Sequence, residues 1–243
     1  MTDELFRDDA TLLQCSATLT GVSEAGLTLD RTVFYPQGGG QAGDTGRLVR
    51  ADGASLAIVD TRKGAEPGQI LHLVAPGTDL SGWAAGQAVT AHIDADRRMA
   101  HRRFHTATHL LCALVPHPVD GCSITAGYAR LDFHMTEPLD KDTLTAGIAR
   151  LVAAATPVTT RWISDAELDA NPGLVRSMSV QPPRSASGSG RVRLVDVQGV
   201  DLQPCGGTHA AENSRIVERF QDRRTFPASI RVRIRRTWIQ CQS

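Results

Sequence analysis

The sequence contains no long apolar segment. No run approaches the roughly 18 consecutive apolar residues that a membrane-spanning helix needs. The N-terminal residues are rich in acidic side chains, whereas a secretory signal has a basic end followed by an apolar stretch. Both observations argue against a membrane protein and a secreted precursor. We therefore expect a soluble, cytoplasmic protein without a membrane partner.

Aromatic side chains are scarce, and the chain has neither an even number of cysteines nor an excess of charge of one sign. The five cysteines are an odd number at scattered positions, which argues against a disulfide framework and for reduced thiols or metal ligands. Aromatic residues make up 5% of the chain, so Leu, Val, Ile and Ala must form the core. The 26 basic residues balance the 26 acidic ones, and this excludes a general binder of polyanions.

The charge is nevertheless unevenly distributed. Residues 1–60 carry nine acidic against four basic side chains, whereas residues 176–236 carry twelve arginines against five acidic side chains. A basic C-terminal part is typical of a surface that faces a nucleic acid. A solvated basic strand face explains the pattern equally well, so charge alone leaves both interpretations open.

The N-terminal part of the chain has the pattern of a β-domain. Short strand-like segments at residues 17–20, 26–34 and 55–59 are separated by Gly, Asp and Pro. No strong helical periodicity precedes residue 95. We therefore predict a small β-barrel domain that comprises residues 1–95.

The remainder of the chain predicts both helices and strands. Residues 99–115 are free of Gly and Pro and predict a helix that stops before Pro116. Residues 123–135 are strand-like, and residues 140–155 predict a helix with one apolar face. Residues 96–243 are therefore expected to form an α+β domain, and the whole protein belongs to the α+β class.

Two pairs of potential metal ligands stand out, each with its members four residues apart. His105 and His109 lie within the predicted helix, so their imidazoles leave the same face one turn apart. Cys205 and His209 repeat this spacing on a turn that contains two glycines. Three imidazoles and one thiolate suit tetrahedral Zn²⁺, and we predict one zinc site from these four residues.

The sequence leaves alternatives to this site open. A single histidine pair on a helix is more often structural than metal-binding, and the argument for a metal depends on the two matched pairs. Cys112, three residues after His109, can either bind the metal or pack as a small apolar side chain. Thr106 stands where a zinc peptidase carries its catalytic Glu, so a peptidase is disfavoured. A set of four protein ligands is also typical of a structural site.

Residues 34–46 contain five glycines in the sequence Phe-Tyr-Pro-Gln-Gly-Gly-Gly-Gln-Ala-Gly-Asp-Thr-Gly. The segment lacks the lysine of a phosphate-binding loop, which argues against a nucleotide site. Three consecutive glycines allow the backbone to approach a small substrate closely, while Gln41 and Asp44 offer hydrogen bonds. By itself the segment is compatible with a plain turn or with a functional loop.

Together these motifs resemble the AlaX family of freestanding alanyl-tRNA editing proteins and the matching editing domain of alanyl-tRNA synthetase. The family's glycine loop matches residues 35–46, its histidine helix matches residues 105–111, and its second ligand pair matches residues 205–209. The similarity extends nearly from end to end, and the length resembles that of the medium-size subgroup. The chain departs from the family pattern directly after His209, and Cys112 stands where relatives frequently have His.

The resemblance implies a hydrolase that removes a wrong amino acid, chiefly serine and with glycine as a second candidate, from mischarged tRNA-Ala. It implies an α+β zinc-containing editing domain of the threonyl/alanyl-tRNA synthetase type. The family's zinc ligands, which take part in catalysis, correspond to His105, His109, Cys205 and His209.

The resemblance also implies a substrate pocket. Gly39, Gly40 and Gln41 correspond to a pocket wall from the barrel domain, and Gln41 is a candidate catalytic residue. Accepting serine while rejecting alanine requires a group that hydrogen-bonds the serine hydroxyl. Zinc, Gln41 and Thr208 are the candidates for this group.

The basic segment 215–236 is expected to hold the phosphates of the tRNA acceptor stem, with Arg223 and Arg224 as candidate contacts. Two other functions compete with this interpretation. Editing domains of threonyl-tRNA synthetase share the two ligand pairs, which makes a Ser-tRNA-Thr deacylase the first alternative. The second is a non-catalytic tRNA-binding module in which four ligands close a structural zinc site.

Overall fold

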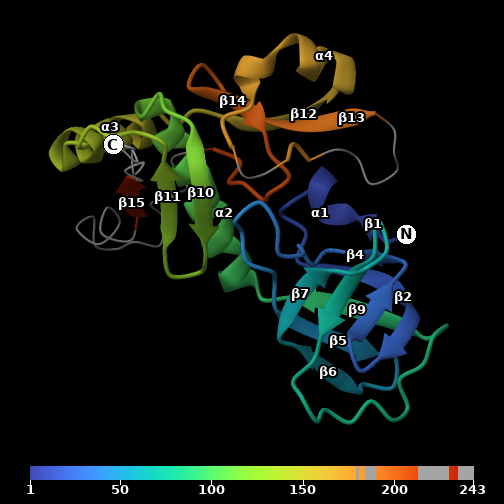
Figure 1. Ribbon diagram of the computed structural model, residues 1–243. Helices are drawn as coiled ribbons and strands as arrows, with labels where there is room; N and C mark the ends of the chain where they lie inside the picture. Colours follow the sequence, from blue (N-terminus) through green and yellow to red (C-terminus); the bar gives the residue numbers. More distant parts are fainter. Residues whose placement is uncertain (179–180, 184–189, 213–229, 235–243) are drawn as a thin grey trace, which may run out of the picture. The chain divides into compact units, whose positions relative to one another are not determined.

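The computed structural model describes residues 1–178, 181–183, 190–212 and 230–234. The chain forms two compact units. The first consists of Met1–Arg102 together with Gly206–Thr208, and the second of Arg103–Cys205 together with His209–Ser243. In Figure 1 most of the first unit is coloured from blue to teal. Because helix α2 (Ala95–Leu114) continues past Arg102, it contributes residues to both units.

One seven-stranded sheet forms the scaffold of the first unit, with the strand order β6-β5-β9-β2-β3-β8-β7. Its strands are β2 (Gln14–Ser23), β3 (Gly26–Leu29), β5 (Gly46–Arg50), β6 (Ser55–Ile58), β7 (Asp60–Lys63), β8 (Ile70–Leu73) and β9 (Ala88–Ile93). Beside it, β1 (Asp3–Glu4) pairs in parallel with β4 (Arg31–Thr32), and the short helix α1 (Leu5–Asp8) follows β1.

Two bends in the chain curl this sheet. The first half of β2 pairs with β9, and its second half pairs with β3 after an irregularity between Leu19 and Gly21. The edge strands β6 and β7 are separated only by Val59, yet they pair with β5 and β8 respectively. The two edges of the sheet therefore meet at Val59. Apolar side chains from both halves of the sheet form one core, among them Leu19, Leu29, Leu48 and Ile58.

This arrangement corrects the prediction of a small β-barrel for residues 1–95. Within the described part of the chain, no hydrogen-bonded ladder joins β6 to β7, so the curled sheet is not a closed barrel. The reason is covalent, because β6 and β7 are successive halves of one bent strand and continue each other. The strands expected at 17–20 and 55–59 are confirmed within β2 and β6. The expected strand 26–34 is interrupted at Asp30, between β3 and β4.

Helix α2 confirms the helix predicted at residues 99–115 and is held at both ends. At its start, Asp94 Oδ1 accepts hydrogen bonds from the backbone N–H groups of Asp96 and Arg97, at 3.0 and 3.1 Å. At its C-terminal end, Arg176 Nη2 donates to the carbonyl oxygens of Cys112, in the last turn, and of Val115, directly after the helix, at 3.0 and 2.9 Å. These bonds satisfy backbone groups that a helix leaves open at its termini.

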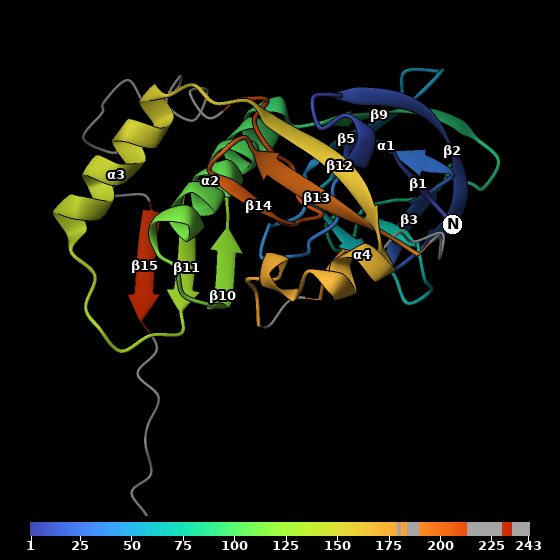
Figure 2. The same ribbon diagram turned by 90° about the horizontal axis from the view of Figure 1, so that it is seen from above.

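The second unit contains two three-stranded sheets. Strands β10 (Val119–Ile124), β11 (Ala129–Phe133) and β15 (Ile230–Ile234) form the first, in which β15 runs parallel to β11. Strands β12 (Val158–Ser164), β13 (Arg191–Val197) and β14 (Asp201–Pro204) form the second, which is antiparallel. Figure 2 shows the two sheets together with helices α2 and α3. The segment expected as one strand at 123–135 is thus a hairpin that turns between Ile124 and Ala129.

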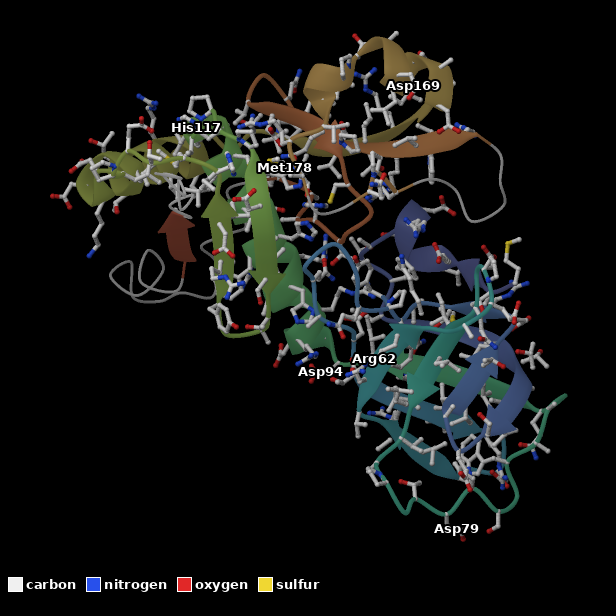
Figure 3. All side chains as sticks on the ribbon, viewed as in Figure 1. Arg62, Asp79, Asp94, His117, Asp169 and Met178 are labelled. Carbon is white, nitrogen blue, oxygen red and sulfur yellow. The ribbon has the colours of Figure 1, made fainter. Side chains whose placement is uncertain are left out.

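Helix α3 (Lys141–Ala153) confirms the helix expected at residues 140–155, and Asp140 caps it by accepting from the Thr143 N–H. The main core of the unit joins α2, α3 and both sheets through side chains such as Leu110, Ile148 and Val195. Helix α4 (Asp165–Ala170) and the short helix η1 (Pro172–Leu174) flank the second sheet, with the exposed Asp169 labelled on α4 in Figure 3. No described helix is both long and apolar enough to cross a membrane.

Candidate metal centre

Three histidines and one cysteine of the second unit lie together. His105, His109, Cys205 and His209 offer ligand atoms that all lie within 4.8 Å of one another. Cys205 Sγ is 3.3 Å from Nε2 of His105 and 3.3 Å from Nε2 of His209. The three histidines are buried, and Cys205 is half-buried. The structure thus brings together the four residues in which the sequence predicts a metal site.

A helix and a strand deliver these side chains. On α2, His105 and His109 are one turn apart and share a face. On β14 and just beyond it, Asp201, Gln203 and Cys205 occupy alternate positions, so an extended backbone points all three to one side. The backbone of Cys205 is fixed to Arg193 on β13. Cys205 N–H donates to the Arg193 carbonyl (3.1 Å), and Arg193 Nη1 donates to the Cys205 carbonyl (2.8 Å).

Polar side chains contact the outer nitrogens of two of the histidines. His109 Nδ1 donates to Asp201 Oδ2 at 2.7 Å, and Gln203 Nε2 donates to the same carboxylate oxygen at 2.7 Å. Thr106 Oγ1 lies 3.4 Å from His209 Nδ1 and accepts the Ala210 N–H at 3.0 Å. The threonine at the position of a peptidase's catalytic Glu therefore contacts a histidine of the candidate metal cluster instead.

The buried groups shift one another's ionisation. Burial raises the pKa of Cys205, but the neighbouring His105 and His209 outweigh burial and hold this pKa well below its usual value. Burial and His105 lower the pKa of His209. Burial also lowers the pKa of His109, yet its hydrogen bonds to Asp201 and Cys205 outweigh this and raise the pKa to about 10. Because the thiolate is the form of cysteine that binds metals, this cluster could hold a metal ion.

Cys112 is not among the clustered donors. Its side chain is 5% exposed and packs in the main core of the second unit. Burial raises the pKa of Cys112 to about 12, which keeps it a neutral thiol. Of the two roles that the sequence allows for Cys112, the structure favours packing. The cysteines of the described residues, Cys15, Cys112, Cys122 and Cys205, are all free thiols.

The glycine loop of the first unit contains a tight turn. Gly38 and Gln41 exchange two backbone hydrogen bonds of 3.0 Å each, and Gly39 and Gly40 are the two residues between them. Both have positive φ, at +56° and +81°. A two-residue turn with positive φ at both central positions favours glycine, which explains why the sequence has it there.

Gln41 is held by Thr208, which is 167 positions away in the chain. Gln41 Nε2 donates to Thr208 Oγ1 at 3.0 Å, and the Thr208 N–H donates to Gln41 Oε1 at 3.1 Å. Both residues are fully buried. Thr208 belongs to the same unit as Gln41 and directly precedes His209 in the chain.

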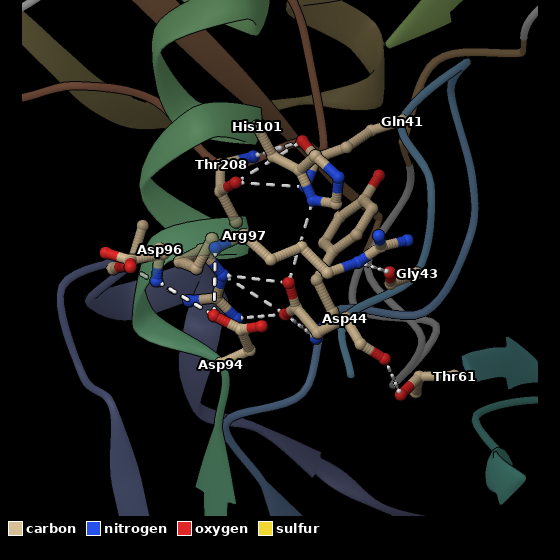
Figure 4. A network of polar contacts seen from close by, with 12 residues as sticks. Gln41, Gly43, Asp44, Thr61, Asp94, Asp96, Arg97, His101 and Thr208 are labelled. Atoms are coloured by element: carbon tan, nitrogen blue, oxygen red, sulfur yellow. Dashed lines mark hydrogen bonds and ion pairs between the residues drawn. The ribbon is translucent and has the colours of Figure 1, made fainter. Parts of the chain in front are cut away.

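Asp44 fixes the other end of the glycine loop, as Figure 4 shows. Its carboxylate accepts the Tyr35 N–H at 2.7 Å and forms an ion pair with Arg98, and both charged side chains are 1% exposed. Thr61 Oγ1 donates to the Asp44 carbonyl at 2.8 Å. Burial raises the pKa of Asp44, but His101 and Arg98 outweigh this and lower it. The loop is therefore anchored by a buried ion pair.

Sequence reasoning missed three residues of this framework: Asp201, Gln203 and Arg98. For Asp201 and Gln203 a signal was available, because they alternate with Cys205 in a short strand. For Arg98, which pairs with Asp44, the sequence contains no local signal. The candidate tRNA contacts Arg223 and Arg224 lie outside the described residues.

Comparisons with known proteins agree on one family. A family profile described as "tRNA synthetases class II (A)" matches residues 8–97. The alanyl-tRNA editing protein AlaX-M of Methanosarcina barkeri is 33% identical over 225 residues, which cover 89% of this chain and 90% of that protein. AlaX-M of Saccharolobus solfataricus is 30% identical over 90% of this chain and 91% of its own length. An alanine--tRNA ligase of Methanothermobacter thermautotrophicus is 33% identical over 91% of this chain but only 25% of the ligase.

Proposed function

The chain belongs to the AlaX-M family of alanyl-tRNA editing proteins, and we propose that it is a deacylase that hydrolyses mischarged tRNA-Ala in trans. Its main substrate is Ser-tRNA-Ala, with Gly-tRNA-Ala as a second candidate. The observation that carries the proposal is the cluster of three histidines and a cysteine. These side chains form a donor set suited to metal-assisted hydrolysis, in a chain that belongs to an editing family.

We assign Zn²⁺ to the cluster from the chemistry of its donors. His105, His109, Cys205 and His209 supply three nitrogens and one sulfur, the mixture that a borderline-soft divalent ion with tetrahedral preference takes. When bound there, zinc supplies positive charge and Lewis acidity next to the ester. The ester of an aminoacyl-tRNA is already activated, so the chain needs no serine nucleophile.

The remaining residues of the proposed site act on specificity. Gly39 and Gly40 keep the loop compact, and Gln41 and Thr208 hold each other through two hydrogen bonds. A polar pair of this kind suits recognition of the serine hydroxyl, since a site built to bond a hydroxyl strongly rejects the analogue that lacks it. Arg223 and Arg224 stay candidates for phosphate contacts with the acceptor stem.

Deacylation of Ser-tRNA-Ala, Gly-tRNA-Ala, Ala-tRNA-Ala and Ser-tRNA-Thr should be measured side by side, with the zinc content of the same preparation. We expect selective release of serine from tRNA-Ala by zinc-loaded protein. A preference for Ser-tRNA-Thr would assign the chain to the threonyl type instead. No hydrolysis of any substrate by zinc-loaded protein would support a non-catalytic tRNA-binding module and contradict the proposal.

Replacing Cys205 tests whether the reaction depends on the metal. Cys205→Ala should remove zinc and lower serine release together, by more than about tenfold, because one of four donors is lost. Cys15→Ala is the matched control, since Cys15 is a half-buried thiol of the first unit and should leave both quantities unchanged. Full activity of Cys205→Ala without bound metal would exclude this cluster as the active site.

A further inference from the structure

Asp201 is a buried carboxylate that the proposed reaction does not use. Its side chain is 5% exposed. Within the described part of the chain, its ion-pair partner is His109 and no lysine or arginine pairs with it. A buried negative charge is costly unless a positive charge compensates it. Among the described residues His109 is therefore the group that compensates Asp201, and the same histidine belongs to the cluster that could hold a metal ion.

The contacts of Asp201 determine how His109 presents its ring. A carboxylate only accepts hydrogen bonds, so the 2.7 Å bond places a hydrogen on His109 Nδ1. The nitrogen that is left for a metal is then Nε2. Gln203 limits the freedom of the carboxylate, because its Nε2 donates to the same oxygen at 2.7 Å.

The backbone provides the reason why these residues act together. Asp201, Gln203 and Cys205 alternate along one extended segment, so the element that supplies the thiolate also supplies the two groups that hold His109. A shift of this strand by one residue would turn all three side chains away at once. Holding of His109 and ligation by Cys205 are therefore coupled by geometry.

We propose that Asp201 is a positioning residue of the metal centre: it holds His109 with Nε2 toward the ion, and its charge strengthens metal binding through the imidazole ring. A carboxylate behind a ligating histidine fixes the ring and raises its basicity. The identity of the metal rests on the proposed function. The effect on metal binding does not depend on tRNA and can be tested without it.

The variant Asp201→Asn tests the charge while keeping the shape and an acceptor oxygen. Zinc affinity of the full chain should be measured by competition with a chelator, and the visible absorption of the Co²⁺-loaded protein should be recorded. We expect Asp201→Asn to bind Zn²⁺ about 10–100-fold more weakly and to shift the Co²⁺ bands. Asp196→Asn, on the neighbouring strand β13 opposite Leu202, is the matched control and should change neither.

Wild-type affinity and an unchanged Co²⁺ spectrum in Asp201→Asn would overturn the proposal. A measurement on the wild type keeps the test independent of the variant's folding. In zinc-loaded protein with ¹⁵N-labelled histidine, the ring of His109 should carry its hydrogen on Nδ1 and bind through Nε2. Coordination through Nδ1 would contradict the role of Asp201. If the wild type bound no zinc at all, the metal assignment of the proposed function would fail first.

Discussion

At the scale of single residues, Gln41 and Thr208 depend on each other. Each supplies a donor and an acceptor to the other, and neither is exposed to water that could replace a lost partner. A buried amide or hydroxyl left without a partner costs about 1–3 kcal/mol. Any change at one of the two residues therefore lowers stability, and under the proposed function it also affects recognition of the serine hydroxyl.

Gln41→Ala should lower serine release from tRNA-Ala by at least about tenfold, which corresponds to about 1.4 kcal/mol. It should also reduce the free energy of unfolding by about 1–3 kcal/mol, because the Thr208 N–H loses its acceptor. Zinc content should not change, since Gln41 supplies no ligand atom. Kinetics on Ser and Ala esters, chemical denaturation and metal analysis check the three expectations.

Gln37→Ala serves as the control for this variant. Gln37 lies in the same loop but is exposed. Gln37→Ala should therefore leave the kinetics unchanged and the free energy of unfolding within about 0.5 kcal/mol of the wild type. Unchanged discrimination between Ser and Ala esters in Gln41→Ala would remove Gln41 from the substrate pocket.

At the scale of elements, helix α2 carries His105 and His109 of the candidate metal centre, and a residue from another segment stabilises its C-terminal end. Its last turn contains no basic residue of its own. Arg176 fills this place from a distant segment, with bonds to the carbonyl oxygens of Cys112 and Val115. Since cations are favourable at helix C-termini, Arg176 stabilises the helix through its charge as well as through these bonds.

Arg176→Ala should destabilise the protein by about 1.5–3 kcal/mol, the range for hydrogen bonds to a charged group. The loss is expected because open carbonyl oxygens at the end of α2 lose their donor. Urea denaturation followed by circular dichroism measures it. Arg150→Ala, an exposed arginine in the last turn of α3, should change stability by less than about 0.5 kcal/mol. Equal stabilities of the two variants would show that Arg176 does not support α2.

The sequence predicted elements and pairs whose determinants are local. The helix at residues 99–115 and the spacing of His105 and His109 follow from one segment, so both could be stated in advance. The bend between β6 and β7 could not be predicted. Its position depends on β6 pairing with β5 and β7 pairing with β8, and the sequence of the bend itself does not specify these partners. The bonds of Gln41 to Thr208 and of Asp44 to Arg98 were equally out of reach, since each joins residues far apart in the chain.

At the scale of the whole molecule, each unit has its own apolar core, so folding does not depend on the metal alone. Removing zinc should abolish deacylation while circular dichroism retains its native shape. Stability should fall by about 2.7 kcal/mol relative to protein with free zinc at 100 times its dissociation constant. Adding Zn²⁺ back should restore both quantities, whereas Mg²⁺ should restore neither. Global unfolding on chelation would point to a structural zinc module.

The free energy of unfolding should fall at acidic pH, in part because of a buried histidine of the first unit. His72 Nδ1 donates to the Leu27 carbonyl, its Nε2 accepts from Thr32 Oγ1, and burial lowers its pKa to about 4. The unfolded chain takes up this proton near pH 6.5, so stability should be constant above pH 6.5 for this group and should fall between pH 6.5 and 4. The total decrease in the free energy of unfolding from this group is about 3 kcal/mol.

Denaturant unfolding at several pH values measures this slope. His72→Gln should be less stable at neutral pH but should lack this part of the pH dependence, because it removes the group that titrates. His134→Gln is the control, since His134 is an exposed histidine and should keep the acid limb of the wild type. The same slope in His72→Gln as in the wild type would assign the acid sensitivity to other groups.

The membership of Gly206–Thr208 in the first unit has a consequence for synthesis in the cell. A ribosome that adds about 5–20 residues per second produces Thr208 roughly 5–20 s after Arg102. During that interval a nascent chain carries Gln41 without Thr208, with which its side chain exchanges hydrogen bonds in the finished protein. A message that ends before codon 208 would therefore yield a first unit that lacks Thr208 in its interior. Such an incomplete unit would be a preferred target for proteases and chaperones.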